Sequence, residues 1–458
     1  MAIDQLKTLV EIALKEAESK VDAFIARATV ETQNQIRFSS GMIDINKQWE
    51  KSLLDLFVVV EQNQVGITQV PVSDETSVKK AVQDLIVFAH KLPPSPFYRG
   101  VEERTFDYPS IPDSFDQKID TFVEKAPEYI NSAIQAGIDA GAKRIAGSFL
   151  FGKEEYYFGS LTGLEGNYRT TSYELTIRAF QDEMESSGQG LACGKIPTND
   201  FKQMEMAGVR AGELSKLSID GKQGEPGIYD VIMEPTVAAN VIGSIPGAAN
   251  PLMMMMGMSP LQDKMGQQLA PDFITIRERP HQKNGLASVP FDFEGTKTQE
   301  TPLFEKGVFT GVVHNTSSAR MAGTESTGNS ILIDVGGKLL APGPTNLVFE
   351  AGDASLDELF SLSSKRTLYI TSNWYTRYTS QVDGDFSTIP RDGLFIVENG
   401  EITKPVRNLR LSDNLLRMFK SIQALGKDVK QIKWWEVGTP TWIAAMRIED
   451  CRMTAATQ

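Results

Sequence analysis

A short glycine-rich segment, Gly221 to Gly227, restricts the fold of this sequence more than any other feature. It holds three glycines and Pro226 within seven residues, so it offers little surface to bury. Such a composition is typical of a connection between folded units. A chain of 458 residues is also too long for one ordinary hydrophobic core. We therefore predict an N-terminal domain over residues 1–220 and a C-terminal domain over residues 228–458.

Before this segment, the order of helix, strands and helix occurs twice. Apolar residues spaced three and four apart predict helices over residues 4–21, 77–92 and 120–140. Thr198 or Asn199 is expected to cap a further helix. Because a proline-rich break at Pro93–Pro96 interrupts the pattern, we expect two subdomains, residues 1–96 and 111–220, with helices packed on mixed sheets. The strands expected between these helices cover residues 22–31, 35–38, 44–48, 53–60, 147–151, 156–162 and 168–179.

After the glycine-rich segment, short strand-like runs alternate with Gly and Pro turns, which is typical of antiparallel sheets. Residues 235–245 predict a short buried helix. Near the end, Ser412 is expected to cap a helix that Gly426 ends. The chain is therefore expected to be α+β, with an N-terminal α/β region and a predominantly antiparallel β domain that has few helices.

The composition excludes several classes of protein. The formal net charge is −13, and no Lys/Arg cluster is longer than Lys79-Lys80, so direct binding of nucleic acid is not expected. No apolar run approaches the ~18 residues of a membrane span. The two cysteines, Cys193 and Cys451, lie far apart and are expected to be idle thiols in a reducing cytoplasm.

The common catalytic motifs are missing. The sequence has no His-Glu-x-x-His zinc motif and no Gly-x-Ser-x-Gly nucleophile elbow. Its three histidines, His90, His281 and His314, are far apart, so a local histidine-based zinc site is not expected. We therefore assign no catalytic residue and no metal ligand in this chain.

Two groups of polar residues are candidates for binding a substrate. Asp292 and Glu294 would share one face of an extended segment, where paired carboxylates can do acid–base work; the alternative is a solvated turn that Gly295 favours. Asn373, Tyr375 and Arg377 would likewise share one face of a strand. That face would line a polar cleft or be the solvent side of a sheet.

Methionine is concentrated in one segment. Met253, Met254, Met255, Met256, Met258 and Met265 lie within thirteen residues. Thioether side chains are adaptable, so the segment could be a soft surface for a peptide or partner. The alternative is that it is core filler or the flank of a helix.

The order of several short motifs resembles the TldD/PmbA family, long labelled "modulator of DNA gyrase". The resemblance covers nearly the whole chain. Each motif is short, and their common order carries the likeness. The motifs are Phe38-Ser-Ser-Gly41-Met42-Ile43, Val65-Gly66, Gly159 to Ala179, Ser259 to Gly266, Phe291-Asp-Phe-Glu-Gly295, Ala319-Arg320, Ser326-Thr-Gly-Asn329, Gly393 to Ile402, Pro405-Val406 and Pro440.

The resemblance also implies what this chain lacks. Active TldD-type members carry a helix with His-Glu-x-x-x-His, which binds zinc and supplies a general base, and a cysteine near the C-terminus completes the site. The corresponding helix here is Pro235 to Ile245, and no His, Asp, Glu or Cys occurs from Pro235 to Gln262. Cys451 does not match the family's cysteine position. The chain thus resembles the PmbA (TldE) branch, which lacks the zinc-protease motif and acts as partner to a zinc-bearing subunit.

Three functions follow as expectations. The first is a non-catalytic subunit of a metalloprotease complex that holds unfolded or extended peptides, with zinc only in a TldD-type partner. The second is a stand-alone peptide-binding or chaperone-like homodimer. The third is an enzyme whose site is built on His314 with Asp292 and Glu294.

Overall fold

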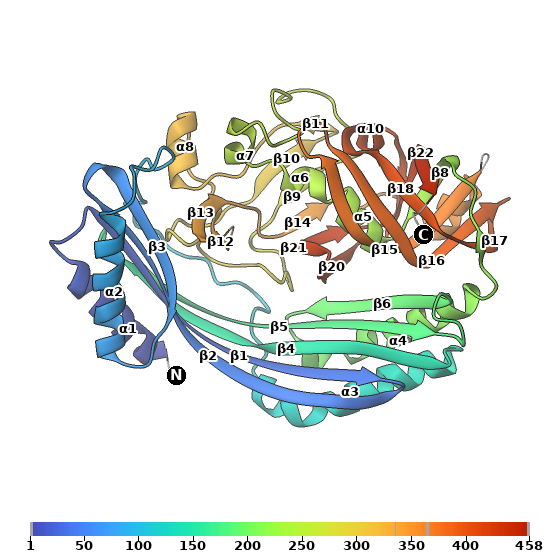
Figure 1. Ribbon diagram of the computed structural model, residues 1–458, viewed down its shortest axis with the longest axis horizontal. Helices are drawn as coiled ribbons and strands as arrows, with labels where there is room; N and C mark the ends of the chain where they lie inside the picture. The colour runs from blue at the N-terminus through green and yellow to red at the C-terminus, as the bar shows by residue number, and fades with distance from the viewer. Residues whose placement is uncertain (1–2, 335, 363–365, 456–458) are drawn as a thin grey trace.

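The computed structural model describes residues 3–334, 336–362 and 366–455. Its N-terminal part is a single six-stranded antiparallel sheet in the order β3-β2-β1-β4-β5-β6, which curves strongly so that the C-terminal part lies over its concave side (Figure 1). The strands are β1 (Ala23–Ser39), β2 (Met42–Val60), β3 (Gln64–Pro71), β4 (Arg144–Ser160), β5 (Glu165–Phe180) and β6 (Ser187–Gly194).

The first strands are much longer than the sequence predicts. Strands of 17 and 19 residues, β1 and β2, replace the four short strands expected over residues 22–60, and β4 runs unbroken across two others. The polar stretch Thr32–Asn34 looked like a break. It pairs residue by residue with β2 and β4 (Gln33 opposite Trp49 and Gly152), because the hydrogen bonds between strands join backbone groups and do not require apolar side chains. The chain turns from β1 into β2 at Ser40 and Gly41, which have φ of 50° and 79°.

Both N-terminal units share this sheet, because β1 pairs with β4 from Ile25–Ser160 to Phe38–Gly147. The helices cover its convex face over two separate hydrophobic clusters (Figure 1). The last of them begins after Asp200 rather than after a cap at Thr198 or Asn199. These helices are α1 (Ile3–Ala17), α2 (Glu75–Ala89), α3 (Ile119–Asp139) and α4 (Phe201–Leu217).

The C-terminal part contains a closed barrel. The ring β15-β8-β22-β18-β16 closes because β15 also pairs with β16, and only its β15–β8 pairing is parallel. The α+β class, with a mostly antiparallel C-terminal half, is thereby confirmed. The barrel strands and their neighbours are β8 (Gly227–Met233), β15 (Thr367–Ser380), β16 (Asp385–Glu398), β18 (Leu409–Asn414), β22 (Met446–Ala455), β7 (Lys222–Gln223), β17 (Glu401–Arg407) and β19 (Ile422–Leu425).

A second sheet lies beside the barrel, and a hairpin lies near β3 of the N-terminal sheet (Figure 1). The sheet has the order β11-β10-β9-β14-β21-β20. Its strands are β9 (Ile276–Glu278), β10 (Thr301–Glu305), β11 (Val308–Phe309), β14 (Leu347–Phe349), β20 (Lys430–Trp434) and β21 (Val437–Ile443), and the hairpin is β12 (Ser330–Asp334) with β13 (Lys338–Pro342). Short helices complete the fold: α5 (Pro235–Val241), α6 (Ser244–Gly247), α7 (Pro251–Met255), α8 (Thr316–Ala322), α9 (Leu356–Ser361) and α10 (Leu415–Lys420).

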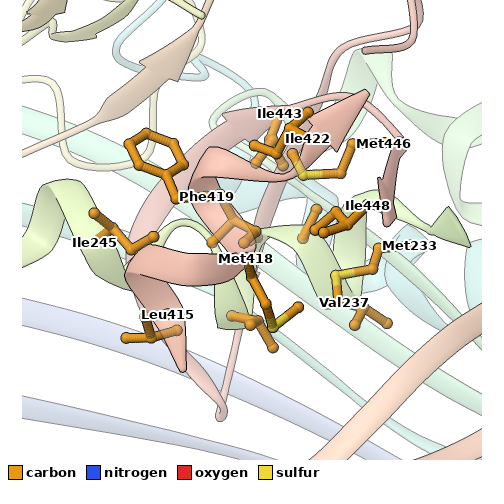
Figure 2. Close-up of a cluster of buried hydrophobic side chains, with 14 of the residues drawn as sticks. Met233, Val237, Ile245, Leu415, Met418, Phe419, Ile422, Ile443, Met446 and Ile448 are labelled. Atoms are coloured by element: carbon orange, nitrogen blue, oxygen red, sulfur yellow. The ribbon is translucent and has the colours of Figure 1, made fainter. Parts of the chain in front are cut away.

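The largest hydrophobic core lies inside the C-terminal part, where α10 packs over α5 and the barrel strands (Figure 2). The predicted terminal helix exists, but its limits were wrong. Asn414 caps it by accepting a hydrogen bond from the Arg417 N–H, and it ends at Lys420. Ile422, expected on the helix, begins β19 because it pairs with Ile448 of β22.

The segment 221–227 passes along the outside of the barrel, where β7 pairs only with β17. The two halves also touch directly through β5 and β6. Arg178 of β5 forms an ion pair with the fully buried Asp392 carboxylate at 2.6 Å, and Gln189 of β6 accepts a hydrogen bond from Ser372. None of the described helices is long and apolar enough to cross a membrane.

Candidate functional site

Helix α5 is the element on which the family resemblance places the missing metal motif. The helix is short and almost wholly apolar, with Val237, Ala238 and Val241 fully or nearly fully buried. It packs against β15 of the barrel and against β20 and β21 of the second sheet. The helix predicted over residues 235–245 is therefore present, divided into α5 and α6.

Asn240 is the polar residue of α5 that links it to the barrel. Its Oδ1 atom accepts hydrogen bonds from Asn373 Nδ2 at 2.7 Å and from the Thr376 hydroxyl, and its Nδ2 donates to the Glu436 carbonyl at 2.6 Å. Asn373 also reaches Thr388 Oγ1 at 2.9 Å. We call Asn240, Asn373, Thr376 and Thr388 the amide–hydroxyl cluster. The cluster is uncharged, so it offers none of the imidazole, thiolate or carboxylate ligands that zinc takes.

Four aromatic residues lie beside this cluster and form what we call the aromatic platform: Trp374, Tyr375, Trp434 and Trp435. Trp434 is buried, whereas Tyr375 and Trp435 are 46% and 56% exposed with ring centroids 5.9 Å apart. The guanidinium groups of Arg178 and Arg391 lie 4.8 and 5.3 Å from the Trp374 ring centre. Exposed, rigidly held aromatic rings are suited to bind peptide side chains.

A β-bulge turns the platform outward. Tyr375 has φ 57°, and the pairing of β15 with β16 shifts between Trp374 and Arg377. The Glu436 carboxylate accepts hydrogen bonds from the N–H groups of Tyr375 (2.7 Å) and Thr376 (3.3 Å), which holds the bulge open. The expectation that Asn373, Tyr375 and Arg377 share one strand face was therefore wrong: Asn373 is fully buried, whereas Tyr375 and Arg377 are exposed.

The carboxylates Asp292 and Glu294 lie in a second place, at the turn that joins the hairpin β12–β13 to the N-terminal sheet. Phe291 pairs with Lys297 across this turn. The turn is not solvated, because the two residues are only 8% and 2% exposed. Asp292 accepts hydrogen bonds from the N–H groups of Glu294, Thr296 and Ser330, and Glu294 accepts one from Thr316 at 2.9 Å. Burial raises the pKa of both carboxyls, that of Glu294 to about 7.

His314 lies near this turn without joining it. Its Nδ1 atom is 3.1 Å from the hydroxyl of Ser318, and burial lowers the pKa of the ring. Ser318 in turn completes the cap of α8 with Asn315. The His314 ring thus contacts the first turn of α8. None of the described hydrogen bonds joins His314 to Asp292 or Glu294.

Several residues of the site were not found from the sequence. Asn240 and Glu436 come from segments remote from β15, and Arg178 comes from the other half of the chain. The adjacent tryptophans Trp434 and Trp435, followed by Glu436, were an available signal, since the chain has only five tryptophans.

No group of three or more His, Cys, Asp or Glu side chains that could hold a metal ion occurs in the described part of the chain. Both cysteines are buried and unpaired, and burial raises the pKa of the Cys193 thiol to about 12. A thiol with so high a pKa stays protonated at neutral pH, so Cys193 is not an activated nucleophile.

The methionine segment lies mostly on the surface. Met255, Met256, Met258 and Met265 are between 41% and 59% exposed, and Met254 packs against the main core. These four residues are therefore not core filler. Met255 is the last residue of the short helix α7 and the other three follow it, so the helix-flank alternative fits them better.

Sequence comparison identifies relatives over most of the chain. The model of the PmbA/TldA metallopeptidase C-terminal domain matches residues 226–455. "Metalloprotease PmbA" of Escherichia coli O157:H7 is 26% identical over 434 residues, covering 93% of this chain and 92% of the relative. "Metalloprotease PmbA homolog" of Haemophilus influenzae is 26% identical over 369 residues, with 78% and 77% covered.

Structure comparison finds the same fold in distant proteins. A Thermotoga maritima protein labelled a modulator of DNA gyrase has a TM-score of 0.82 at 22% identity, covering 98% of this chain and 100% of that one. TldE from Thermococcus kodakarensis has a TM-score of 0.81 at 17% identity, with 98% and 99% covered. Because the family model matches half of the chain and PmbA relatives match nearly all of it, the protein belongs to the PmbA/TldD family and lacks the family's zinc motif.

Proposed function

We propose that this chain is the non-catalytic subunit of a TldD/PmbA-type metalloprotease complex, in which it holds unfolded or extended peptides. One observation carries the proposal. At the helix where the resemblance expects zinc ligands, α5 presents Asn240 to an uncharged cluster, and exposed aromatic rings lie next to it. The proposal also places zinc in a TldD-type partner alone, because peptide hydrolysis needs an activated nucleophile.

The aromatic platform supplies a physical means of holding a peptide. Tyr375 and Trp435 bring large apolar surfaces at a low cost in side-chain entropy, and the Glu436 hydrogen bonds keep the bulge rigid. Arg377 lies over Tyr375, with its guanidinium 6.0 Å from the ring centre, and adds a charge at the edge. Asn373 supports the platform from beneath rather than contacting a peptide.

The test is a hydrolysis assay on unfolded peptides with this chain alone, a TldD-type partner alone, and the two together. We expect the mixture to cleave the peptides, and we expect chelators to stop this cleavage. The partner alone is expected to cleave far more slowly or not at all. Robust chelator-sensitive cleavage by this chain alone would refute the subunit role.

The variant Trp435→Ala tests the platform within the same assay. Truncating an exposed aromatic anchor is expected to weaken peptide binding by about 1–3 kcal/mol, seen as a higher KM in the mixture. Phe88→Ala serves as a matched control, because Phe88 is 52% exposed on α2, at the other end of the sheet. If both variants change KM equally, the aromatic platform does not bind the peptide.

A second candidate function is a peptide-binding, chaperone-like homodimer without a protease partner. The same observation of an exposed aromatic platform supports it. Two measurements distinguish the two functions. Light scattering gives the molar mass of the purified chain, and purification from its native host shows whether a zinc-bearing partner is bound. A stable homodimer with no zinc-bearing partner, and a mixture that cuts no better than the partner alone, would favour this second function.

A further inference from the structure

A small pocket of about 50 Å³ opens at the far end of the N-terminal sheet, away from the aromatic platform. It lies between β2 and β3, the segment 95–98, the start of α8 and the hairpin strand β13. Its walls are mainly apolar and aromatic, and they include one carboxylate. The residues that matter here are Phe57, Phe97, Tyr98, Leu252, Leu340 and Glu294.

Glu294 is an unusual wall residue, because its side chain is almost fully buried and no described ion pair includes it. It accepts a hydrogen bond from the Thr316 N–H at 2.9 Å, and the hydroxyls of Thr316 and Ser330 also lower its pKa. The lining of the pocket contains no Lys or Arg. Desolvation outweighs these hydrogen bonds and raises the pKa of Glu294 to about 7.

The aromatic rings face the same space. Phe57 and Tyr98 have ring centroids 6.2 Å apart, and Phe97 is 37% exposed at the rim. Burial raises the pKa of Tyr98 to about 12, so its hydroxyl stays protonated, and the charge of Glu294 acts in the same direction. Ring faces attract cations, and the attraction strengthens when water is excluded.

We propose that this pocket binds a primary ammonium group on an apolar stem, from a lysine side chain or a peptide N-terminus. A carboxylate and aromatic rings in the lining match that chemistry: the carboxylate would compensate the charge and the rings would contact the stem. The size of the pocket suits one ammonium group and its first methylenes. The peptide source rests on the proposed function, whereas the ammonium site itself does not.

Binding is coupled to the protonation of Glu294. The free pocket favours the neutral acid, and a bound ammonium requires the carboxylate, so binding releases a proton and affinity rises with pH until about pH 7. The neighbouring charges are Asp292 and Glu102, which oppose ionisation, and Arg320 at Tyr98. Asp292 accepts three backbone N–H groups and is already held in the turn.

The experiment titrates the isolated chain by calorimetry with three small probes. Nα-acetyl-lysine methylamide presents a side-chain ammonium, leucine amide presents an N-terminal ammonium, and Nα-acetyl-norleucine methylamide presents none. We expect at least one ammonium probe to bind and the norleucine probe not to bind. The lysine probe is expected to bind about tenfold more tightly at pH 8 than at pH 6, because the ionised fraction of a carboxyl with a pKa of about 7 rises by that factor.

Variants assign the binding to the pocket. Glu294→Gln keeps the shape and removes the charge, so we expect affinity to fall by about tenfold or more and the pH dependence to vanish. Phe97→Ala is expected to weaken binding about threefold by removing one aromatic wall. Glu103→Gln, a carboxylate 71% exposed nearby, is the control and is expected to change nothing.

Three results would overturn the proposal: neither ammonium probe binds, the norleucine probe binds equally well, or Glu294→Gln binds as the unchanged chain does. Because the probes are titrated into the chain alone, none of these results bears on the protease assay. The subunit role and the ammonium site can therefore fail separately.

Discussion

At the scale of single residues, the buried carboxylates matter most, because burial disfavours their ionised form. Glu278 of β9 is fully buried, and its Oε1 atom accepts hydrogen bonds from the N–H (3.0 Å) and hydroxyl of Thr345. Its Oε2 atom has no hydrogen-bond partner among the described residues. Desolvation accordingly raises the pKa of Glu278 to about 7.

This raised pKa predicts how stability depends on pH. The native state binds an extra proton between the unfolded pKa, near 4.5, and about 7, so this residue lowers the free energy of unfolding as pH rises through that window. The variant Glu278→Gln lacks this effect. Its free energy of unfolding relative to the unchanged chain is expected to rise by up to about 3 kcal/mol between pH 5 and pH 8.

Urea unfolding at several pH values measures that difference. Glu305→Gln, on the neighbouring strand β10 and half exposed, controls for the change in net charge. A difference between Glu278→Gln and the unchanged chain that stays constant from pH 5 to pH 8 would contradict the prediction.

At the scale of elements, the tight contact of α4 with β6 depends on glycine. A methyl group at Gly190 of β6 would overlap the carbonyl of Ala207, and one at Gly208 of α4 would overlap the carbonyl of Ala133. Small residues therefore let α4 approach the sheet on one side and α3 on the other. The helix predicted from the sequence is correct, but only the packing explains its many small residues.

We predict that Gly190→Ala destabilises the chain by about 1–3 kcal/mol, because the backbone of α4 must move away from β6. Gly438→Ala in β21 is the matched control, since a methyl group there meets nothing within 4 Å. Thermal unfolding of both variants checks this. Equal melting temperatures for the two variants would show that the α4–β6 contact tolerates an extra methyl group.

At the scale of the whole molecule, we predict that purified protein contains no stoichiometric zinc. The segment from Pro235 to Gln262 has no zinc ligand, and the described residues form no cluster of three. Treatment with EDTA is therefore expected to leave the melting temperature unchanged. Elemental analysis checks the first point, and one tightly bound zinc per chain would contradict it.

We also predict no appreciable affinity for duplex DNA, despite the label carried by some structural relatives. Sequence-independent binding needs several Lys/Arg–phosphate contacts, and the chain carries a net charge of −13. Fluorescence anisotropy with labelled duplex at about 150 mM salt measures this. A salt-sensitive complex with a dissociation constant near the micromolar range would contradict the prediction.

The sequence by itself determined the family, the α+β class, the position of most helices and the lack of His, Asp, Glu and Cys from Pro235 to Gln262. These properties are local: they depend on spacings of three and four residues and on which residue types occur at a motif. The lengths of β1 and β2 depend on distant segments, because the polar stretch at Thr32–Asn34 becomes part of a strand by pairing with β2 on one side and β4 on the other.

Only the tertiary structure decided the site. The bulge at Tyr375 depends on Glu436, sixty-one positions along the chain, and it separates Tyr375 from Asn373, which a regular strand would place on the same face. The turn at Asp292 and Glu294 is buried because the N-terminal sheet and α8 cover it. Spacing in the sequence gives the order of residues along a strand, whereas burial and pKa depend on what distant segments bring against them.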